Sequence, residues 1–298
     1  IWNSPNPSDE GISLLTSTIQ SLMNKFHCLG VPKGQECVVR MALNDYETLV
    51  RNLKSTTIKD CTFLLKYTRY IKSKAEIEKI KYICQQTSQG FEDLTRLLQI
   101  GKSERENCQT FKQHLLTLNI DDFPYLISGS GQGGYSSIIM GPSERILEEG
   151  DIFIIDTGCV YDSYFCDFDR NFAFGKANDK SKKAYKALYN ATTAGFEASL
   201  AGNTTKDIYE AIYKVLDKEG TIGTKVGRFG HGLGLQLTEW PSNMLTHPVK
   251  LEAGAILTLE PSLSYGIGKE MVHEENILIT EDKPIWLSKR ATEELPII

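Results

Sequence analysis

The stretch DIFIIDTGCVYDSYFCDFDRNFAF, residues 151–174, decides the fold. Its two apolar ends predict two strands, and residues 160–163 predict the turn between them, because Asp and Ser are typical turn residues. A hairpin of this kind brings Asp156 and Asp167 close together across the two strands. The sequence therefore predicts two carboxylates that face each other at one end of a β-hairpin.

Two carboxylates in an apolar setting repel each other and resist ionisation. A divalent cation or a shared proton relieves the repulsion, and carboxylates suit hard or borderline cations. The alternative is a pair of solvated Asp side chains at the mouth of a hairpin. The hairpin alone does not decide between these two interpretations.

Three later segments favour the metal. FGHGLGLQLTEWP holds His231 between glycines, ILTLEP ends an apolar strand at Glu260, and MVHEENILIT begins another strand at Glu274. The order Asp, Asp, His, Glu, Glu, with these flanking motifs, resembles the pita-bread metallohydrolases. That family includes methionine aminopeptidase, aminopeptidase P, prolidase and creatinase, and the resemblance runs from about residue 73 onward.

The resemblance implies a fold of the α+β class. Residues 72–298 would form a pita-bread catalytic domain with two pseudo-symmetric halves, and residues 1–71 part of an α/β creatinase-like N-terminal domain. Within this first part, spacing predicts a helix over 12–26, a strand over 37–41 and a helix through 46–53. Further helices are predicted for the catalytic part. Capping boxes begin helices at Ser73 and Ser103, and other helices run over about 180–200 and from 204 or 205 to Gly220.

The resemblance also implies the roles of five residues. Asp156 would bind a first divalent ion, Asp167 and Glu274 would bridge two ions, and His231 and Glu260 would bind the second. We expect two ions, Mn before Fe, Co or Zn, because carboxylates with one imidazole do not form the thiolate-rich structural zinc site. A hydroxide between the ions would attack a carbonyl, and Glu260 would also shuttle a proton to the leaving amine.

The chain departs from the proline-specific members of this family at three positions where they carry further histidines. Ile139, Gly227 and Thr238 stand there. Losing such hydrogen-bond donors costs about 10²–10³ in rate where nothing replaces them. Candidate replacements are Thr238, which we take as a second catalytic residue, and the nearby side chains Tyr135, Glu239 and Trp240.

Three functions remain open. The first is an Xaa-Pro aminopeptidase or dipeptidase that acts on peptides. The second is the same site turned to a small non-peptide amide or related compound, as in ectoine hydrolase or dimethylsulfoniopropionate lyase. The third is an inactive binding module, which the complete ligand set disfavours.

His273 and Arg170 lie close in sequence to predicted ligands, but neither is predicted to bind metal. His273 belongs to HEEN rather than to an HExxH motif, so it is not predicted as a ligand. Arg170 follows the second Asp at the usual position of an Arg in this family, and a structural role is expected for it.

Composition excludes some partners. A net charge of −5 and a pI near 5.7 give no reason to expect nucleic acid, and no run of 18 apolar residues predicts a membrane span. The opening IWNSPNPSDEG has no charged and apolar regions of a signal peptide, and it lacks an initiator Met. Seven scattered cysteines indicate reduced thiols in a cytoplasmic protein. The resemblance further implies a homodimer.

Overall fold

The structure is a computed structural model that describes residues 9, 11–23, 27–35, 37–219 and 227–298. The chain divides into two compact units, residues 1–68 and 69–298. Each unit is described by itself. Among the described residues, no helix is long and apolar enough to cross a membrane.

The first unit contains a small parallel β-pair with helices around it. Strand β1 (Cys28–Val31) pairs with β2 (Thr57–Asp60). The helices are α1 (Ile12–Met23), α2 (Leu43–Asn52) and the start of α3 (Thr62–Tyr70). The predicted helices over 12–26 and 46–53 correspond to α1 and α2, although residues 24–26 lie outside the described residues.

The strand predicted over 37–41 is wrong. Residues 37–40 have no regular secondary structure, and Val38 is 69% exposed. The β-branched composition suited a strand, but the neighbouring segment Cys28–Val31 pairs with Thr57–Asp60 instead. A strand needs a partner in the fold, and composition does not supply one.

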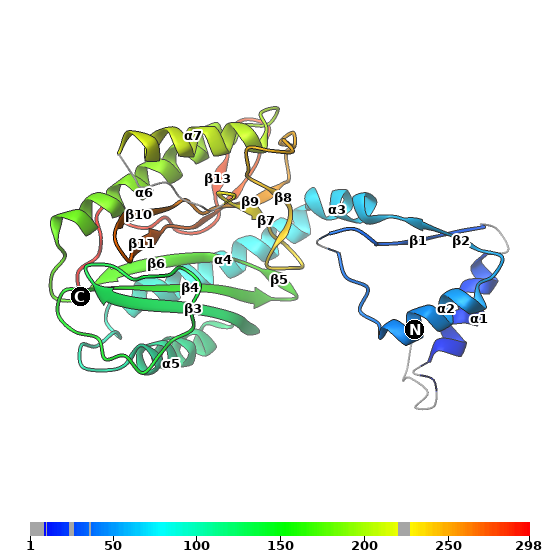
Figure 1. Cartoon of the computed structure of the whole chain (residues 1–298), viewed down its shortest axis with the longest axis horizontal. Coiled ribbons are helices and arrows are strands. Elements are labelled where there is room, and N and C mark those ends of the chain that lie inside the picture. The colour runs from blue at the N-terminus through cyan, green and yellow to red at the C-terminus, as the bar shows by residue number, and fades with distance from the viewer. Residues whose placement is uncertain (1–8, 10, 24–26, 36, 220–226) are drawn as a thin grey trace. The chain divides into compact units, whose positions relative to one another are not determined.

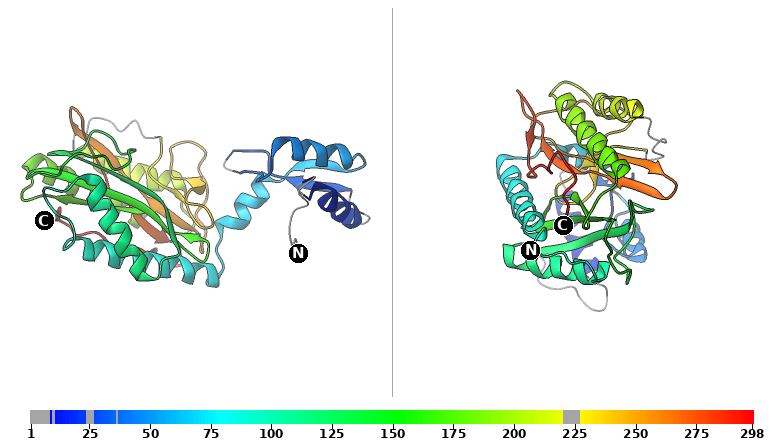
Figure 2. Two further views of the ribbon diagram at one scale, coloured as in Figure 1. Left: turned by 90° about the horizontal axis from the view of Figure 1, so that it is seen from below. Right: turned by 90° about the vertical axis from the view of Figure 1, so that its left-hand side faces the viewer.

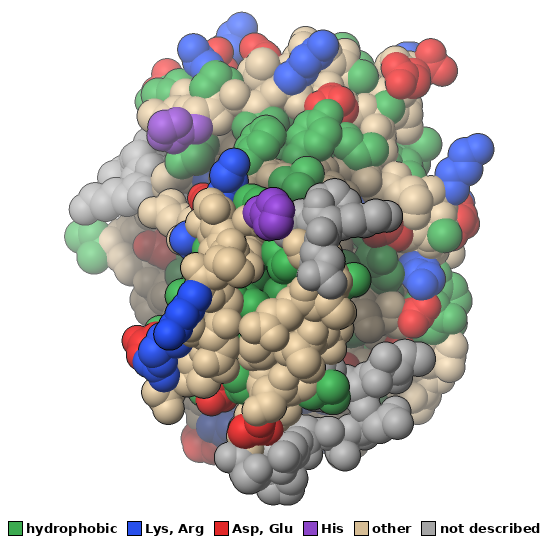
Figure 3. All heavy atoms as spheres, turned by 90° about the vertical axis from the view of Figure 1, so that its right-hand side faces the viewer, with side chains coloured by type: hydrophobic (Ala, Val, Ile, Leu, Met, Phe, Trp, Pro, Cys, Tyr) green, Lys and Arg blue, Asp and Glu red, His purple; other side chains and the backbone are tan. Residues whose placement is uncertain are grey.

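The first unit buries few apolar side chains. Its described core includes Ile12, Leu49 and Leu53, whereas Leu43 and Phe63 are 73% and 68% exposed. Figure 3 shows hydrophobic side chains lying between charged ones on the face of the molecule that it presents. A unit of this size can bury only a limited share of its apolar surface. The prediction that residues 1–71 belong to a creatinase-like domain stays a prediction.

The second unit begins with helices, followed by a sheet. Both capping boxes are confirmed: Ser73 starts α4 (Lys74–Leu94) and Ser103 starts α5 (Glu104–Leu115), which continues into the short 3₁₀ helix η1 (Leu116–Leu118). The sheet that follows consists of β3 (Asp122–Gln132), β4 (Asp151–Tyr161), β5 (Tyr164–Phe165) and β6 (Phe168–Ala173). Strand β4 lies between β3 on one side and β5 and β6 on the other.

The second half repeats the order of helices and then strands. Its helices are α6 (Asp179–Ala198) and α7 (Thr205–Lys218); the predicted stop at Gly220 lies outside the described residues. Its larger sheet has the order β13-β12-β9-β7-β8, and a separate antiparallel pair joins β10 to β11. The strands are β7 (His231–Gly232), β8 (Glu239–Ser242), β9 (Ile256–Leu259), β10 (Ser262–Gly266), β11 (Lys269–Val272), β12 (Glu275–Leu278) and β13 (Ile285–Trp286).

The second unit is layered. Helices α6 and α7 cover the second-half sheet, and α4 and α5 cover the first-half sheet, so the two sheets lie between the helix pairs (Figures 1 and 2). The two apolar cores follow the helix pairs: one includes side chains of α6 and α7, the other includes side chains of α4 and α5, and each also takes side chains from both sheets. The expected α+β architecture, in which helices are followed by strands in each of two halves, is confirmed.

Strand β4 contributes to both cores because successive side chains of a strand point to opposite faces. Ile152 and Ile154 pack into the core with α6 and α7, whereas Phe153 and Ile155 pack into the core with α4 and α5. Asp156 continues the first of these two series. Its carboxylate is therefore directed from the first sheet towards the second half of the unit.

Candidate metal centre

The five predicted residues lie on or beside strands of the two sheets. Asp156 lies in the middle of β4, and Asp167 lies in the break between β5 and β6. His231 begins β7, Glu260 follows β9 directly, and Glu274 precedes β12 directly. We refer to these five side chains as the acidic cage.

Three of the five form a tight group. One ligand atom from each of Asp167, His231 and Glu274 lies within 4.8 Å of the others, and all three residues are buried. The Nε2 atom of His231 is 3.6 Å from Oδ2 of Asp167 and 4.0 Å from Oε2 of Glu260. Asp156 is close enough for its charge to raise the pKa of Asp167. The fold thus brings all five predicted residues into one neighbourhood.

The orientation of His231 is fixed by its backbone neighbours. Its Nδ1 lies 2.9 Å from the carbonyl oxygen of Gly232, and its backbone N–H donates to Thr258. Gly230, with φ of 137°, lets the chain pass so close that a Cβ there would lie 2.1 Å from the Thr258 carbonyl oxygen. An Nδ1 proton held by a carbonyl leaves Nε2 as the basic nitrogen, directed at the carboxylates.

Burial strongly disfavours negative charge in the cage. Desolvation raises the pKa of Asp156 to about 7 and that of Glu260 to about 7. Desolvation and the neighbouring carboxylates hold the pKa values of Asp167 and Glu274 well above their usual range. Four carboxylates are therefore held together without enough positive charge from the protein side chains.

Several cage oxygens also have no hydrogen-bond partner among the residues that the structure describes. They include Oδ1 of Asp156, Oδ1 of Asp167 and Oε1 of Glu274. Unpaired buried acceptors are costly, and native structures rarely leave them so. Carboxylate oxygens together with one imidazole nitrogen are a donor set for divalent cations. The residues present therefore fit a divalent metal centre.

Two residues that support the cage were missed from the sequence. The Tyr125 hydroxyl donates to Oδ2 of Asp156 at 2.9 Å. Asn276 brackets Asp167, because its side-chain oxygen accepts from the Asp167 backbone N–H and its amide donates to the Asp167 carbonyl. Tyr and Asn at these positions give no signal in the sequence, since only strand register brings them next to the acids.

A third residue, the buried acid Asp169, was also missed. The hairpin turn at Asp162 and Ser163 is confirmed, but the strand pairing sets Asp156 opposite Asp169, and Asp167 occupies the break before β6. Asp169 is 1% exposed, and its Oδ2 has no hydrogen-bond partner in the described part of the chain. Desolvation and the charge of Asp156 raise its pKa well above the usual range, while a backbone hydrogen bond from Glu274 opposes the rise.

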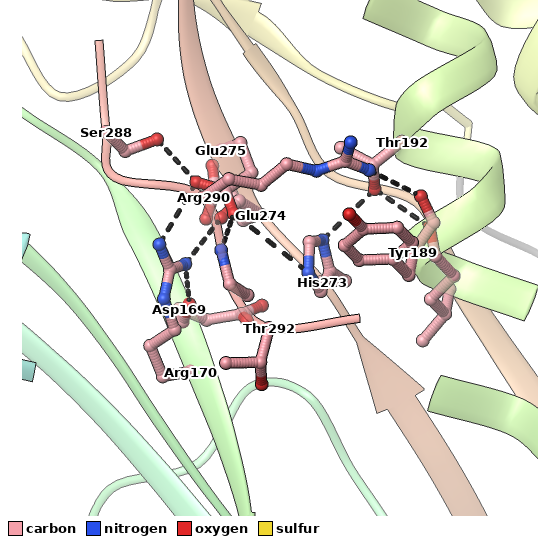
Figure 4. Close-up of polar contacts among 12 residues, drawn as sticks. Asp169, Arg170, Tyr189, Thr192, His273, Glu274, Glu275, Ser288, Arg290 and Thr292 are labelled. Atoms are coloured by element: carbon pink, nitrogen blue, oxygen red, sulfur yellow. Dashed lines mark hydrogen bonds and ion pairs between the residues drawn. The ribbon is translucent and has the colours of Figure 1, made fainter. Parts of the chain in front are cut away.

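The residues behind Glu274 form a buried polar network, shown in Figure 4. Arg170 donates to the carbonyl oxygen of Glu274 at 3.3 Å and to Oε2 of Glu275 at 3.1 Å. His273 Nδ1 lies 3.1 Å from the Thr192 hydroxyl, with the ring directed away from the cage towards α6. Arg170 thus braces the strand that carries Glu274, as a structural residue would.

The three positions that depart from the proline-specific pattern do not contact the cage. Ile139 is 78% exposed in the loop after β3, and Gly227 has open space around it. Thr238 is half-buried in the loop between β7 and β8, and its hydroxyl makes no hydrogen bond to the cage among the described residues. Its catalytic role stays a prediction.

Comparison with known proteins agrees with this geometry. The model of metallopeptidase family M24 matches residues 78–281, which is more than half of the chain. The chain belongs to metallopeptidase family M24. It is therefore a relative of peptidases that use divalent metals.

Individual relatives share about a quarter of their residues with this chain or fewer. The chain is 27% identical over 251 residues to an Xaa-Pro dipeptidase of Pyrococcus furiosus, a match that covers 83% of this chain and 72% of that protein. An X-Pro aminopeptidase of Thermotoga maritima superposes with a TM-score of 0.85 at 21% identity, covering 96% of this chain and 79% of that one. An Xaa-Pro dipeptidase from Bacillus anthracis gives 0.85 at 24% identity, covering 96% and 78%. At these identities the two solved structures show the fold.

Proposed function

We propose that this M24 metallopeptidase hydrolyses Xaa-Pro bonds of small peptides, as an aminopeptidase or a dipeptidase. The observation that carries the proposal is the acidic cage, in which buried carboxylates with unpaired oxygens surround the Nε2 of an oriented histidine. The Xaa-Pro dipeptidase of Pyrococcus furiosus supports the choice of substrate.

In this proposal two divalent ions occupy the cage, Mn in preference to Fe, Co or Zn. Asp156 would hold the first ion, Asp167 and Glu274 would be shared between the two, and His231 and Glu260 would hold the second. When bound, the ions supply Lewis acidity that lowers the pKa of a water and polarises a carbonyl. Four carboxylates and a neutral imidazole balance two divalent charges, which removes the repulsion described above.

Glu260 is the cage residue suited to move a proton. Its side chain is 20% exposed, against 6% for Asp167 and 3% for His231, so its carboxylate can meet water and substrate. A carboxylate that meets water and substrate can accept a proton at one step and return it at the next. We assign it the transfer of a proton from water to the leaving amine.

Thr238 is proposed to donate a hydrogen bond to a substrate oxygen, in place of the histidine of proline-specific relatives. Its loop joins β7, which carries His231, to β8. Replacing Thr238 by His is expected to raise kcat/KM for Xaa-Pro substrates if this donor is what limits the reaction. A well-folded variant with unchanged kcat/KM would remove Thr238 from the catalytic group.

A second candidate is hydrolysis or lysis of a small non-peptide compound at the same site, as in ectoine hydrolase or dimethylsulfoniopropionate lyase. The observation in its favour is that Ile139, Gly227 and Thr238 all lack the imidazoles expected of a proline peptidase. An inactive binding module is disfavoured because the complete donor set is retained.

Three features of organisation accompany the proposal. We propose that residues 1–71 are part of a creatinase-like N-terminal domain and that the protein is a homodimer, both supported by resemblance to the family. A cytoplasmic location is supported by the seven cysteines, which are all free in the structure.

The test is a hydrolysis assay. Protein loaded with Mn²⁺ would be incubated with Xaa-Pro dipeptides, with longer Xaa-Pro peptides and with matched peptides that lack proline. Asp167→Asn serves as the control, because it removes one cage carboxylate. Cleavage of Xaa-Pro bonds by the wild-type protein alone supports the proposal; no cleavage by fully metallated protein moves the assignment to a non-peptide substrate.

A further inference from the structure

A cavity of about 140 Å³ lies between α4, β6 and the segment that follows β13. Arg170 of β6 lines it and stacks over Phe91 of α4, 5.8 Å from the ring centre. The residue before Arg170, Asp169, pairs with Asp156 across the sheet. Because successive side chains of a strand point to opposite faces, Arg170 and the cavity lie on the other face of the first sheet from Asp156.

The walls of the cavity are largely aromatic. Phe91, Phe172 and Tyr185 line it, and all three side chains are buried. An apolar cavity of about 150 Å³ is large enough to take up benzene in another protein. A single apolar ring is therefore the size of body that this cavity suits.

The polar part of the lining is mainly cationic. It includes Arg170, Lys289 and Arg290. Arg170 pairs with Glu275 at 3.1 Å, and Lys289 pairs with Glu92. Arg290 has no carboxylate within ion-pair distance in the described part of the chain. One positive charge of the lining is thus left without a partner of opposite sign.

Arg290 also keeps hydrogen-bonding capacity in reserve. Its guanidinium stacks over the ring of Tyr189, 3.8 Å from the ring centre, and Nη2 donates to the Tyr189 carbonyl oxygen at 2.8 Å (Figure 4). Its Nε is buried and has no partner among the residues that the structure describes. Burial lowers the pKa of Arg290, which shows that its charge is poorly compensated. A guanidinium in this state suits a carboxylate, to which it donates two parallel hydrogen bonds.

We propose that this cavity binds a small organic acid, in which one carboxylate is attached to a single apolar ring. The carboxylate pairs with Arg290, and the ring packs against Phe91 and Phe172. Lys289 adds positive charge at the rim, where its side chain is 65% exposed. The site is separate from the proposed hydrolysis and does not depend on it.

The experiment is calorimetry of the whole chain with benzoate, and with benzamide as the uncharged probe of the same shape. Benzoate is expected to bind the wild-type protein more tightly than benzamide. Its affinity should be the same in protein loaded with Mn²⁺ and in EDTA, because the cavity lies behind the sheet. Arg290→Gln should weaken benzoate about 10- to 100-fold through loss of a charge-assisted hydrogen bond, and leave benzamide nearly unchanged. Arg290→Lys, which keeps the charge and loses the fork, should fall between.

Two lysines provide a matched pair of further variants. Lys289 lies at the rim, whereas Lys186 of α6 is outside the lining; each is well exposed and pairs with a glutamate. Lys289→Gln should weaken benzoate several-fold, and Lys186→Gln should not change its affinity. Because both changes are at exposed side chains, this comparison still decides the matter if Arg290→Gln does not fold.

Four results would each overturn the inference. They are no binding of benzoate, equal binding of benzoate and benzamide, an unchanged benzoate affinity in Arg290→Gln, and equal effects of Lys289→Gln and Lys186→Gln. Benzoate binding that disappears in EDTA would place the acid on the metal of the acidic cage instead, and would overturn the inference as well.

Discussion

Asp167→Asn is expected to stabilise the metal-free protein, although it removes a predicted metal ligand. Asp167 is only 4% exposed, and desolvation together with the charges of Asp156 and Glu260 raises its pKa well above 3.8. The folded state therefore binds this proton more tightly than the unfolded chain does. Asn has nearly the same shape and carries no ionisable proton, so it avoids this cost.

The size of the effect follows from linkage. Between the unfolded pKa of 3.8 and the raised folded pKa, the native state binds more protons, so the unfolding free energy falls as pH rises. Each pH unit is worth about 1.4 kcal/mol, which sets a ceiling of about 4 kcal/mol at pH 7 and about 1.6 kcal/mol at pH 5. Because the new amide also needs hydrogen-bond partners, we expect a gain of about 1–4 kcal/mol at pH 7.

Urea unfolding in EDTA at pH 7 and pH 5 measures this gain. The control is Asp162→Asn in the same hairpin, where the carboxylate is 60% exposed and pairs with Lys79 at 2.6 Å. It should change the unfolding free energy by less than about 1 kcal/mol. Added Mn²⁺ should stabilise the wild-type protein and stabilise Asp167→Asn much less, because the metal binds only a folded, complete cage.

Either of two results would refute this reasoning. The first is an Asp167→Asn protein that is less stable than wild type in EDTA at pH 7. The second is an equal stabilisation of both proteins by Mn²⁺. The first would show that Asp167 is not a strained buried acid, and the second that it does not contact the metal.

Three further predictions concern other parts of the centre. Lys72→Met leaves the buried Glu239 without its ion-pair partner, so it should lower the unfolding free energy measured in urea by about 3–5 kcal/mol. The double variant Lys72→Met with Glu239→Gln should recover at least half of that loss. A double variant as unstable as Lys72→Met alone would contradict the pairing. Gly230→Ala, whose Cβ would collide with backbone, should lower the metal bound per chain measured by elemental analysis, whereas Gly227→Ala, with open space around it, should not. Asp169→Asn should raise the unfolding free energy in EDTA by about 1–3 kcal/mol and keep its metal content; loss of the metal would show instead that Asp169 is a ligand.

Much of the fold could be predicted because its signals are local. The capping boxes at Ser73 and Ser103 depend on residues three apart, and the helical stripes on spacings within one element. The order of the acids and of His231 was equally visible, since each lies on or beside an apolar strand. Local patterns of this kind can be recognised in a short segment, without knowing how the rest of the chain folds.

The remaining errors and omissions are questions of pairing. The strand predicted over 37–41 failed because a segment nine residues earlier pairs with Thr57–Asp60. Asp169 was overlooked although the register is the same on both sides of Asp167: Tyr161 pairs with Tyr164 beside the turn, and the same register places Asp156 opposite Asp169. The contacts of Arg228 with Glu260 and of Asn276 with Asp167 likewise depend on how the second sheet is placed, which spacing along the sequence does not show.

The division of the cage between the two sheets also sets a time order during protein synthesis. Asn276, which brackets Asp167, follows it by 109 residues. At about 5–20 residues per second, the ribosome completes this stretch about 5–20 s after Asp167 has been made. During that interval the nascent chain holds the first two carboxylates without His231, Glu260 or Glu274. A growing chain is thus incapable of cutting peptides, its own included, until both halves have emerged and closed on each other.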